Sequence, residues 1–340
     1  MRRAAPNPDV VVLPGDFYMH RFAGAAKGPA DEAGVRTLSR IVNDFSRAFP
    51  RAQFVVALGN NDAPCGDYRS ELGTPFARAI AHLWAPLVDR RGAAPDFENA
   101  FARNGYYVAN VPALHLRIVA IDTVLWSQIY GGNCEARSSG APARQLAWLD
   151  ATLRATRPDT HNVVLMHVPP GYDAFATQLA HGLVAWPYLL GADNSALVRA
   201  LASPQNRVAF AIAGHAHRFN VRVAGDTRVV DIGSISPIYG TDPVFYTMRV
   251  DDAGGIGAFT AWSYDDSRWL PRAFEAGWET PQLDARGRIA YCAQTELGDG
   301  FVRCANLQRR VAIVPVVLVA IGLAIALLAF AMIRRRRAAT

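Results

Sequence analysis

RVAFAIAGHAH, residues 207–217, joins a short apolar run to two histidines that are separated by one residue. A short uninterrupted apolar run is consistent with a strand that is buried on both faces. Three similar runs also end in polar clusters: residues 8–13 before Gly15-Asp16, 53–58 before Asn60-Asn61-Asp62, and 162–166 before His167. Ligand sites form at the carboxyl ends of strands in open α/β sheets. The sequence therefore predicts that the four clusters meet in space.

Helical periodicity separates these runs. Apolar spacing predicts helices over residues 31–49, 74–88, 142–156 and 194–202. Further strands are predicted at 106–111, 114–121, 221–223, 228–232, 245–250 and 258–264. The alternation favours an α/β fold whose later strands pair antiparallel. Periodicity is weak from 265 to 308, and residues 265–310 are expected to form a loosely structured neck.

The polar clusters carry the chemistry of a metal site. Carboxylate, amide and imidazole ligands together suit zinc, manganese or iron. Two such ions about 3.5–4 Å apart can lower the pKa of a bound water and hold a phosphoryl group. The residues expected to converge are Asp16, His20, Asn60, Asn61, Asp62, His167, His215 and His217. A purely structural role is the alternative for each, most of all for the turn residues Asn61 and Asp62.

The order and spacing of these clusters resemble the calcineurin-like metallophosphoesterases. The motifs that carry the resemblance are Gly15-Asp16, Gly59-Asn60-Asn61-Asp62, His167 and Gly214-His215-Ala216-His217. Residues 145–149 (QLAWL), 167–171 (HVPPG) and 234–237 (SISP) resemble the acid sphingomyelinase-like phosphodiesterases within that family. The resemblance implies an α/β fold built as a four-layer α/β/β/α sandwich of mixed sheets, in a domain covering residues 1–264.

The resemblance also implies a role for each residue. The metal ligands would be Asp16, Asn60, His167, His215 and His217. Asp16 would bridge two divalent ions, with zinc as the first expectation and manganese or iron as alternatives. His217 would belong to the second ion and the other ligands to the first. His20 would contact the substrate phosphate, and Asp62 would orient a ligand through a hydrogen bond.

The chain departs from the family pattern at two places. The family opens with a strand ending in Asp-x-His that supplies two ligands to the second metal, and no run before Pro8 matches it. The second site is therefore expected to be incomplete in this chain. A start codon assigned too late would explain this together with the missing export signal, and loss of a metal is the alternative. At Asn61 the family has a histidine that protonates the leaving group, whereas an amide cannot act as an acid.

These features predict a hydrolase that cleaves phosphodiesters with metal-activated water, using His20 and Asn61 beside the metals. The Asn-Asn-Asp variant at residues 60–62 resembles the endopolyphosphatase branch, so phosphoanhydride hydrolysis of polyphosphate is an alternative. A membrane-tethered phosphate-binding protein without catalysis is a second alternative, motivated by both departures.

The C-terminal region predicts a membrane anchor. Residues 311–333 contain no charged side chain, and at 1.5 Å per residue they span about 34 Å, enough for a hydrocarbon core of ~30 Å. Four arginines follow in the basic tail, residues 334–340. They favour a cytoplasmic tail and an extracytoplasmic catalytic domain; a tail-anchored cytoplasmic domain is the alternative.

The net charge of +6 owes much to those four arginines, and the remainder gives no indication of a nucleic-acid groove. The sequence does not indicate an oligomeric state. The four cysteines, Cys65, Cys134, Cys292 and Cys304, allow three pairings, between which the sequence cannot choose. Cys292 with Cys304 and Cys65 with Cys134 are plausible disulfides, and free thiols are the alternative.

Overall fold

The computed structural model describes residues 1–134, 141–238, 240–251, 254–265, 268–272 and 285–307. Its strands are β1 (Val10–Leu13), β2 (Gln53–Val56), β3 (Tyr107–Val111), β4 (Leu116–Ala120), β5 (His161–Leu165), β6 (Val208–Ala213), β7 (Asn220–Ala224), β8 (Thr227–Asp231), β9 (Val244–Val250), β10 (Ile256–Asp265) and β11 (Arg268–Arg272). Its α-helices are α1 (Phe22–Ala25), α2 (Ala30–Ala48), α3 (Pro75–Val88), α4 (Phe97–Asn104), α5 (Ala141–Arg154), α6 (Ala174–Leu179), α7 (Gly191–Ala202), α8 (Ala285–Thr295) and α9 (Gly300–Cys304).

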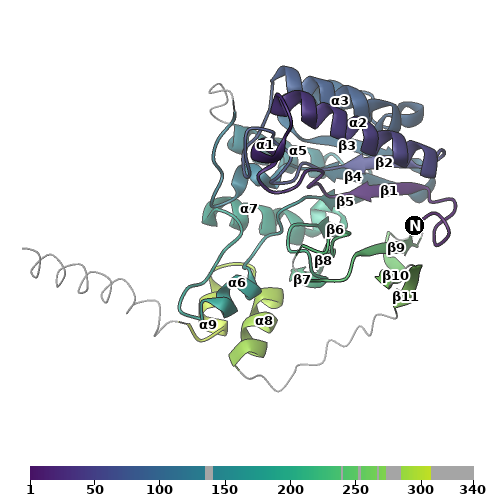
Figure 1. The fold of residues 1–340 in the computed structure, drawn as a ribbon. Helices are drawn as coiled ribbons and strands as arrows, with labels where there is room; N and C mark the ends of the chain where they lie inside the picture. Colours follow the sequence, from purple (N-terminus) through teal and green to yellow (C-terminus); the bar gives the residue numbers. More distant parts are fainter. Residues whose placement is uncertain (135–140, 239, 252–253, 266–267, 273–284, 308–340) are drawn as a thin grey trace, which may run out of the picture.

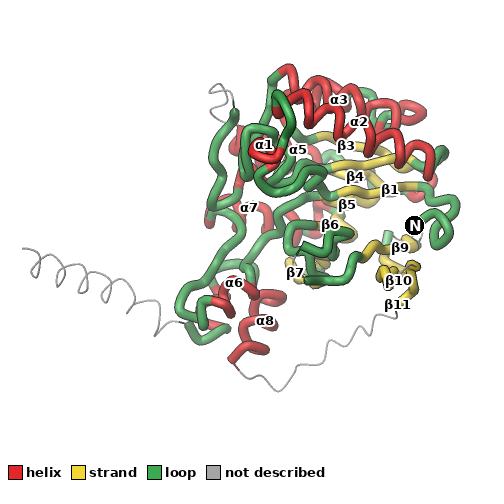
Figure 2. The backbone as a smooth tube through the Cα atoms, viewed as in Figure 1, coloured by secondary structure: helices red, strands yellow, loops and turns green. Residues whose placement is uncertain are grey.

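The described strands form three sheets (Figures 1 and 2). The largest has the order β3-β4-β5-β6-β8-β7, with β4, β5, β6 and β8 parallel and an antiparallel strand at each edge. Strands β1 and β2 pair in parallel, and β9, β10 and β11 form an antiparallel meander. The predicted α/β class with mixed sheets is confirmed.

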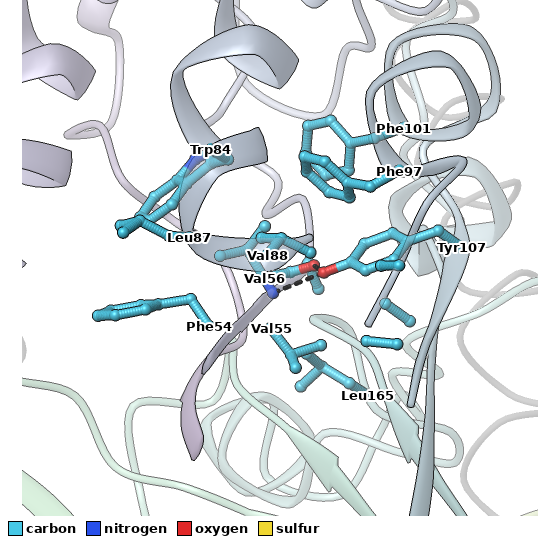
Figure 3. Close-up of a cluster of buried hydrophobic side chains, with 14 of the residues drawn as sticks. Phe54, Val55, Val56, Trp84, Leu87, Val88, Phe97, Phe101, Tyr107 and Leu165 are labelled. Atoms are coloured by element: carbon cyan, nitrogen blue, oxygen red, sulfur yellow. Dashed lines mark hydrogen bonds between the residues drawn. The ribbon is translucent and has the colours of Figure 1, made fainter. Parts of the chain in front are cut away.

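The two-stranded sheet and the large sheet lie between two layers of helices. On β2, Phe54 packs toward Trp84 of α3, while Val55 faces Leu165 of β5 (Figure 3). The Tyr107 hydroxyl donates to the Val56 carbonyl at 2.9 Å and accepts from the Val56 amide at 2.8 Å. The opposite face of the large sheet packs against α5 and α7 through leucines at 149, 153, 197 and 201. This is the four-layer order that the resemblance implies.

The ends of α3 show how local sequence sets an element. Thr74 precedes the helix and its Oγ1 accepts a hydrogen bond from the Ala77 amide at 3.1 Å. Pro75 occupies the first helical position, where its missing N–H would have no intrahelical partner. The predicted start of this helix is therefore confirmed to within a residue. The short helices α4 and α6 were not predicted.

The expected loosely structured neck does not describe residues 285–307. Helices α8 and α9 bury Ile289, Cys292 and Phe301, and the Phe301 ring stacks on Tyr172 with centroids 4.1 Å apart. The helices are short, and their apolar side chains contact a separate part of the chain. The helical periodicity of the sequence is therefore weak in this region.

Both plausible disulfides are present, Cys65–Cys134 and Cys292–Cys304. Within the described ranges, no helix combines the length and hydropathy needed to cross a bilayer. The predicted transmembrane helix at 311–333 and the basic tail at 334–340 lie outside the described residues.

Candidate metal and phosphate site

Two glycine turns bring the ends of β1 and β2 into backbone contact. Gly15 and Asp16 both have positive φ, 101° and 60°. A Cβ on Gly59 would collide with the Asp16 backbone nitrogen, and one on Gly15 would collide with the Gly59 nitrogen. Glycine is required at both positions because the turns approach closely. Asp16 is thereby held beside the cluster that follows β2.

Asp62 joins the two turns. Its carboxylate accepts hydrogen bonds from the amides of Gly59, Asp16 and Phe17 at 2.7, 3.0 and 2.6 Å. Burial, together with the nearby charge of Asp16, raises the pKa of Asp62 to about 6. The contact with the Asp16 amide is the kind of orienting hydrogen bond that the resemblance implies for Asp62.

Asn60 lies at the centre of the cluster. Its Oδ1 is 2.9 Å from His167 Nε2 and 2.8 Å from His215 Nδ1. His167 Nε2 is also 3.3 Å from Asp16 Oδ1. The sequence-predicted ligands of the first metal are therefore linked in a chain at 2.8–3.3 Å, from Asp16 to His167 to Asn60 to His215.

His167 shows why this cluster fits a cation. Its Nδ1 lies 2.7 Å from the Pro14 carbonyl oxygen, which can only accept, so the Nδ1 proton is committed there. Nε2 then faces two oxygen acceptors and requires either a second proton or a cation. Burial lowers the pKa of His167, but the Asp16 charge and hydrogen bond outweigh it, and the net shift is upward.

Asp16 and His215 are in the protonation states that metal ligation needs. Burial raises the pKa of Asp16, but the His167 charge and hydrogen bond outweigh it and bring the pKa to about 2. Burial, then the charge of His167, lowers the pKa of His215 to about 3. Burial also lowers the pKa of His217. At neutral pH the cluster therefore presents the Asp16 carboxylate and the neutral imidazoles of His215 and His217, while the Asp16 charge favours the protonated form of His167 as long as no cation is bound.

Asn61 holds two ligands together. Its backbone amide donates to Asp16 Oδ1 at 3.0 Å and its Nδ2 donates to Asp16 Oδ2 at 2.9 Å. Its Oδ1 accepts from Asn60 Nδ2 at 2.8 Å. The side chain is buried and makes these contacts at the position where the family carries an acid.

Asp16 and His217 are the two residues that the resemblance assigns to a second metal ion. Asp16 and His217 influence each other electrostatically. Among the residues that the structure describes, no group of three imidazole, thiolate or carboxylate side chains at ligand spacing includes Asp16 or His217. Cys65, Glu71 and Cys134 do lie within ligand spacing of one another. Their two sulfurs form a disulfide, so this group offers no thiolate ligand.

Sequence reasoning missed three residues around the cluster. Asp67 Oδ2 lies 3.1 Å from His20 Nδ1, and Asp67 Oδ1 accepts from the Arg21 amide at 2.9 Å. Tyr68 OH lies 3.4 Å from His215 Nε2, and the Tyr188 ring packs edge-on against the His215 ring. Asp67 and Tyr68 follow the Asn60 cluster within eight residues, which was the available signal. Tyr188 belongs to no motif.

Carboxylate, amide and imidazole side chains thus meet where β1 and β2 of one sheet and β5 and β6 of the other end, an arrangement that could hold divalent ions of the kind that act on phosphate esters. The family model "Calcineurin-like phosphoesterase" matches residues 2–219. The chain belongs to the calcineurin-like phosphoesterases.

Among relatives, the Bos taurus "Cyclic GMP-AMP phosphodiesterase SMPDL3A" is 27% identical over 230 residues, 66% of this chain and 47% of the relative. The "Sphingomyelinase phosphodiesterase D" of Dictyostelium discoideum is 26% identical over 260 residues, 72% of this chain and 53% of the relative. These matches confirm the resemblance to the acid sphingomyelinase-like branch. The chain spans about half the length of these relatives.

A solved structure, the "Putative 5'-Nucleotidase from Staphylococcus aureus in complex with alpha-ketoglutarate", aligns with a TM-score of 0.37 and 15% identity. It covers 78% of this chain and 43% of that one.

Proposed function

We propose that this chain hydrolyses phosphodiesters at the Asp16 cluster in a metal-dependent reaction. The observation that carries the proposal is that His167 Nε2 lies 2.9 Å from Asn60 Oδ1 and 3.3 Å from Asp16 Oδ1. Such an acceptor-rich arrangement is costly in a buried site unless a positive charge balances it. Asp16, Asn60, His167 and His215 would hold the first divalent ion, and Asp16 with His217 would contribute to a second. Zinc suits these ligands, with manganese or iron as alternatives.

A bound divalent ion would supply Lewis-acid stabilisation of the phosphate and lower the pKa of a water. The protein's own residues would prepare the site. Asn61 and Asp62 keep Asp16 in one orientation, and Pro14 fixes the tautomer of His167. His20 would bind the phosphate and protonate the leaving oxygen, because Asn61 has no acidic proton.

Metal loading and substrate choice test the proposal together. The full chain, treated with chelator and then given zinc or manganese, is expected to hydrolyse bis(p-nitrophenyl) phosphate only after metal is returned. Elemental analysis counts the ions per chain. A chain that binds metal and phosphate without turnover would instead be the phosphate-binding protein.

Asp67 provides a sharper test of the role of His20. Because Asp67 accepts from His20 Nδ1, it directs Nε2 away from Asp67. Asp67→Asn is expected to lower turnover of an alkyl phosphodiester about 10- to 100-fold. The loss should be much smaller with p-nitrophenol as leaving group, which departs without a proton.

Asp193→Asn, a half-buried carboxyl on α7, serves as the matched control and should change neither rate. Equal losses of Asp67→Asn on both substrates would show that His20 is not the acid.

Phosphoanhydride hydrolysis is the second candidate. Asn61 stands at the position where the family has an acid, and an amide cannot protonate a leaving group. A phosphate leaving group needs no such proton, so this residue favours a phosphoanhydride substrate. Chain-length analysis of polyphosphate after incubation separates the two. Shortened polyphosphate with intact phosphodiesters would select the endopolyphosphatase-like activity.

We further propose that residues 311–333 anchor the protein in a membrane, with the catalytic domain outside the cytoplasm. The supporting observations are the uncharged run, the arginines that follow it, and the two disulfides. Protease protection of the tail in intact membranes tests this orientation. Digestion of the tail from outside would contradict it.

A further inference from the structure

Large apolar side chains that remain exposed are concentrated at the edge of the molecule that carries the metal cluster. Within the described residues, the exposed large hydrophobics are Met19, Ile129, Phe175, Leu179, Leu183, Val184, Trp186, Leu190, Ile235, Ile238 and Tyr264. All except Tyr264 lie in connections that leave the carboxyl ends of β1, β4, β5 and β8. The connections after β1 and β5 also carry Asp16 and His167. The exposed apolar side chains and the candidate site thus lie at the same edge of the molecule, where the strands end.

The densest part of this set is residues 175–190, which we call the apolar ridge. Phe175 and Leu179 lie one turn apart on α6, and Leu179 is 70% exposed. The chain then turns back: the Asp173 amide donates to the Trp186 carbonyl at 2.7 Å, and the Trp186 amide donates to Thr177 Oγ1 at 3.2 Å. These two hydrogen bonds tie Trp186 back to the start of α6, while the Trp186 side chain is 50% exposed.

The ridge adjoins the metal cluster on one side. The Arg218 guanidinium lies 5.1 Å from the Phe175 ring centroid, and Arg218 follows His217 directly. Tyr188, at the end of the ridge, packs against the His215 ring. Arg218 is itself exposed, so a basic group stands between the ridge and the ligands.

On its other side the ridge adjoins the end of the described chain. Leu307 packs against Gly182, where an added Cβ would lie 3.2 Å from the Leu307 side chain. Helices α6, α8 and α9 lie together at one end of the molecule (Figure 1). The uncharged run begins at Val311, only four residues later. Four extended residues span at most about 14 Å, so a bilayer holding that run would come close to the ridge.

We propose that the apolar ridge is a membrane-contacting surface, so that the candidate site faces a lipid bilayer. Exposed leucine and tryptophan side chains partition into the acyl boundary and interface, and an adjacent arginine suits the phosphate headgroups. A ridge placed this way would present phosphodiester headgroups to the cluster without their leaving the membrane. The inference concerns binding and stands whether or not the site is catalytic.

Tryptophan fluorescence of the full chain in phosphatidylcholine vesicles tests the proposal. Brominated acyl chains are expected to quench the tryptophan fluorescence of the unmodified protein more strongly than that of the Trp186→Phe variant. The difference in quenching between the two proteins reports the contact of Trp186 with lipid. Leu179→Glu combined with Leu183→Glu should remove that difference, because burying two carboxylates in the boundary weakens contact about tenfold or more. Tyr264→Glu, an exposed site away from the ridge, should leave it unchanged.

Vesicle-bound protein without Trp186-specific quenching would overturn the proposal, as would protein that does not bind the vesicles. Self-association that is abolished by the two glutamates, with no lipid quenching, would assign the ridge to a second copy of the chain instead. None of these readouts requires turnover, so failure of the proposed hydrolase would leave the result interpretable.

Discussion

Asp16→Asn is expected to lower phosphodiester turnover about 10³-fold, a loss typical of removing a central electrostatic group. The carboxylate accepts two hydrogen bonds from Asn61 and balances the charge on His167. With its pKa near 2, it stays ionised across the working pH range. An asparagine turns an NH₂ toward one of the donors of Asn61 and removes the negative charge. The measurements are kcat, metal content and thermal unfolding on the same preparation.

Asp226→Asn, in the exposed turn between β7 and β8, is the matched control and should retain both metal and activity. If Asp16→Asn kept metal and turned over substrate at the normal rate, the chemistry would lie elsewhere. If Asp16→Asn unfolded, His215→Asn would test whether the proposed metal site is needed for turnover without disturbing the contacts of the Asp16 turn.

Arg222→Met is expected to cost about 3–5 kcal/mol of unfolding free energy, the range measured when one partner of a buried ion pair is removed. Arg222 and Asp231 are 2% and 0% exposed, with Nε to Oδ2 at 2.7 Å. The guanidinium also donates to the Tyr172 and Ala293 carbonyls at 3.0 and 2.9 Å. It thereby ties α8 to the large sheet. Denaturant unfolding gives the free energy.

The loss of unfolding free energy caused by Arg222→Met should become smaller as the pH falls. Burial already raises the pKa of Asp231, and loss of Arg222 would raise it further. A carboxyl with a raised folded-state pKa favours the folded protein most at low pH, and that contribution is lost as the pH rises through the folded pKa.

Arg47→Met removes a partner of the exposed Asp44 and should leave the free energy of unfolding almost unchanged, because solvent screens an exposed ion pair. Equal effects of the two substitutions would show that the buried pair does not hold α8 in place. Combining Arg222→Met with Asp231→Leu should recover part of the loss, because no buried charge remains unpaired.

The sequence itself determined the four parallel strands β1, β2, β5 and β6 and the polar residue types that follow them. Buried parallel strands read as uninterrupted apolar runs, and the polar residues that follow them can only lie at the carboxyl edge. The runs at residues 8–13, 53–58, 162–166 and 207–213 could therefore be placed as strands, and the candidate site residues followed from their positions. The metal-ligand roles stay predictions, and the metal content will test them.

Only the tertiary structure decided the contacts between segments distant in sequence. Asp67 meets His20 across 47 positions, and Arg222 reaches Ala293 across 71. Three cysteine pairings fitted the sequence, and the fold selects one because Cys65 and Cys134 are brought 6.0 Å apart between their Cα atoms. Periodicity and motifs indicate which residues of one helix or strand are buried and which are exposed. Which elements touch depends on how the layers pack, and no local pattern encodes that.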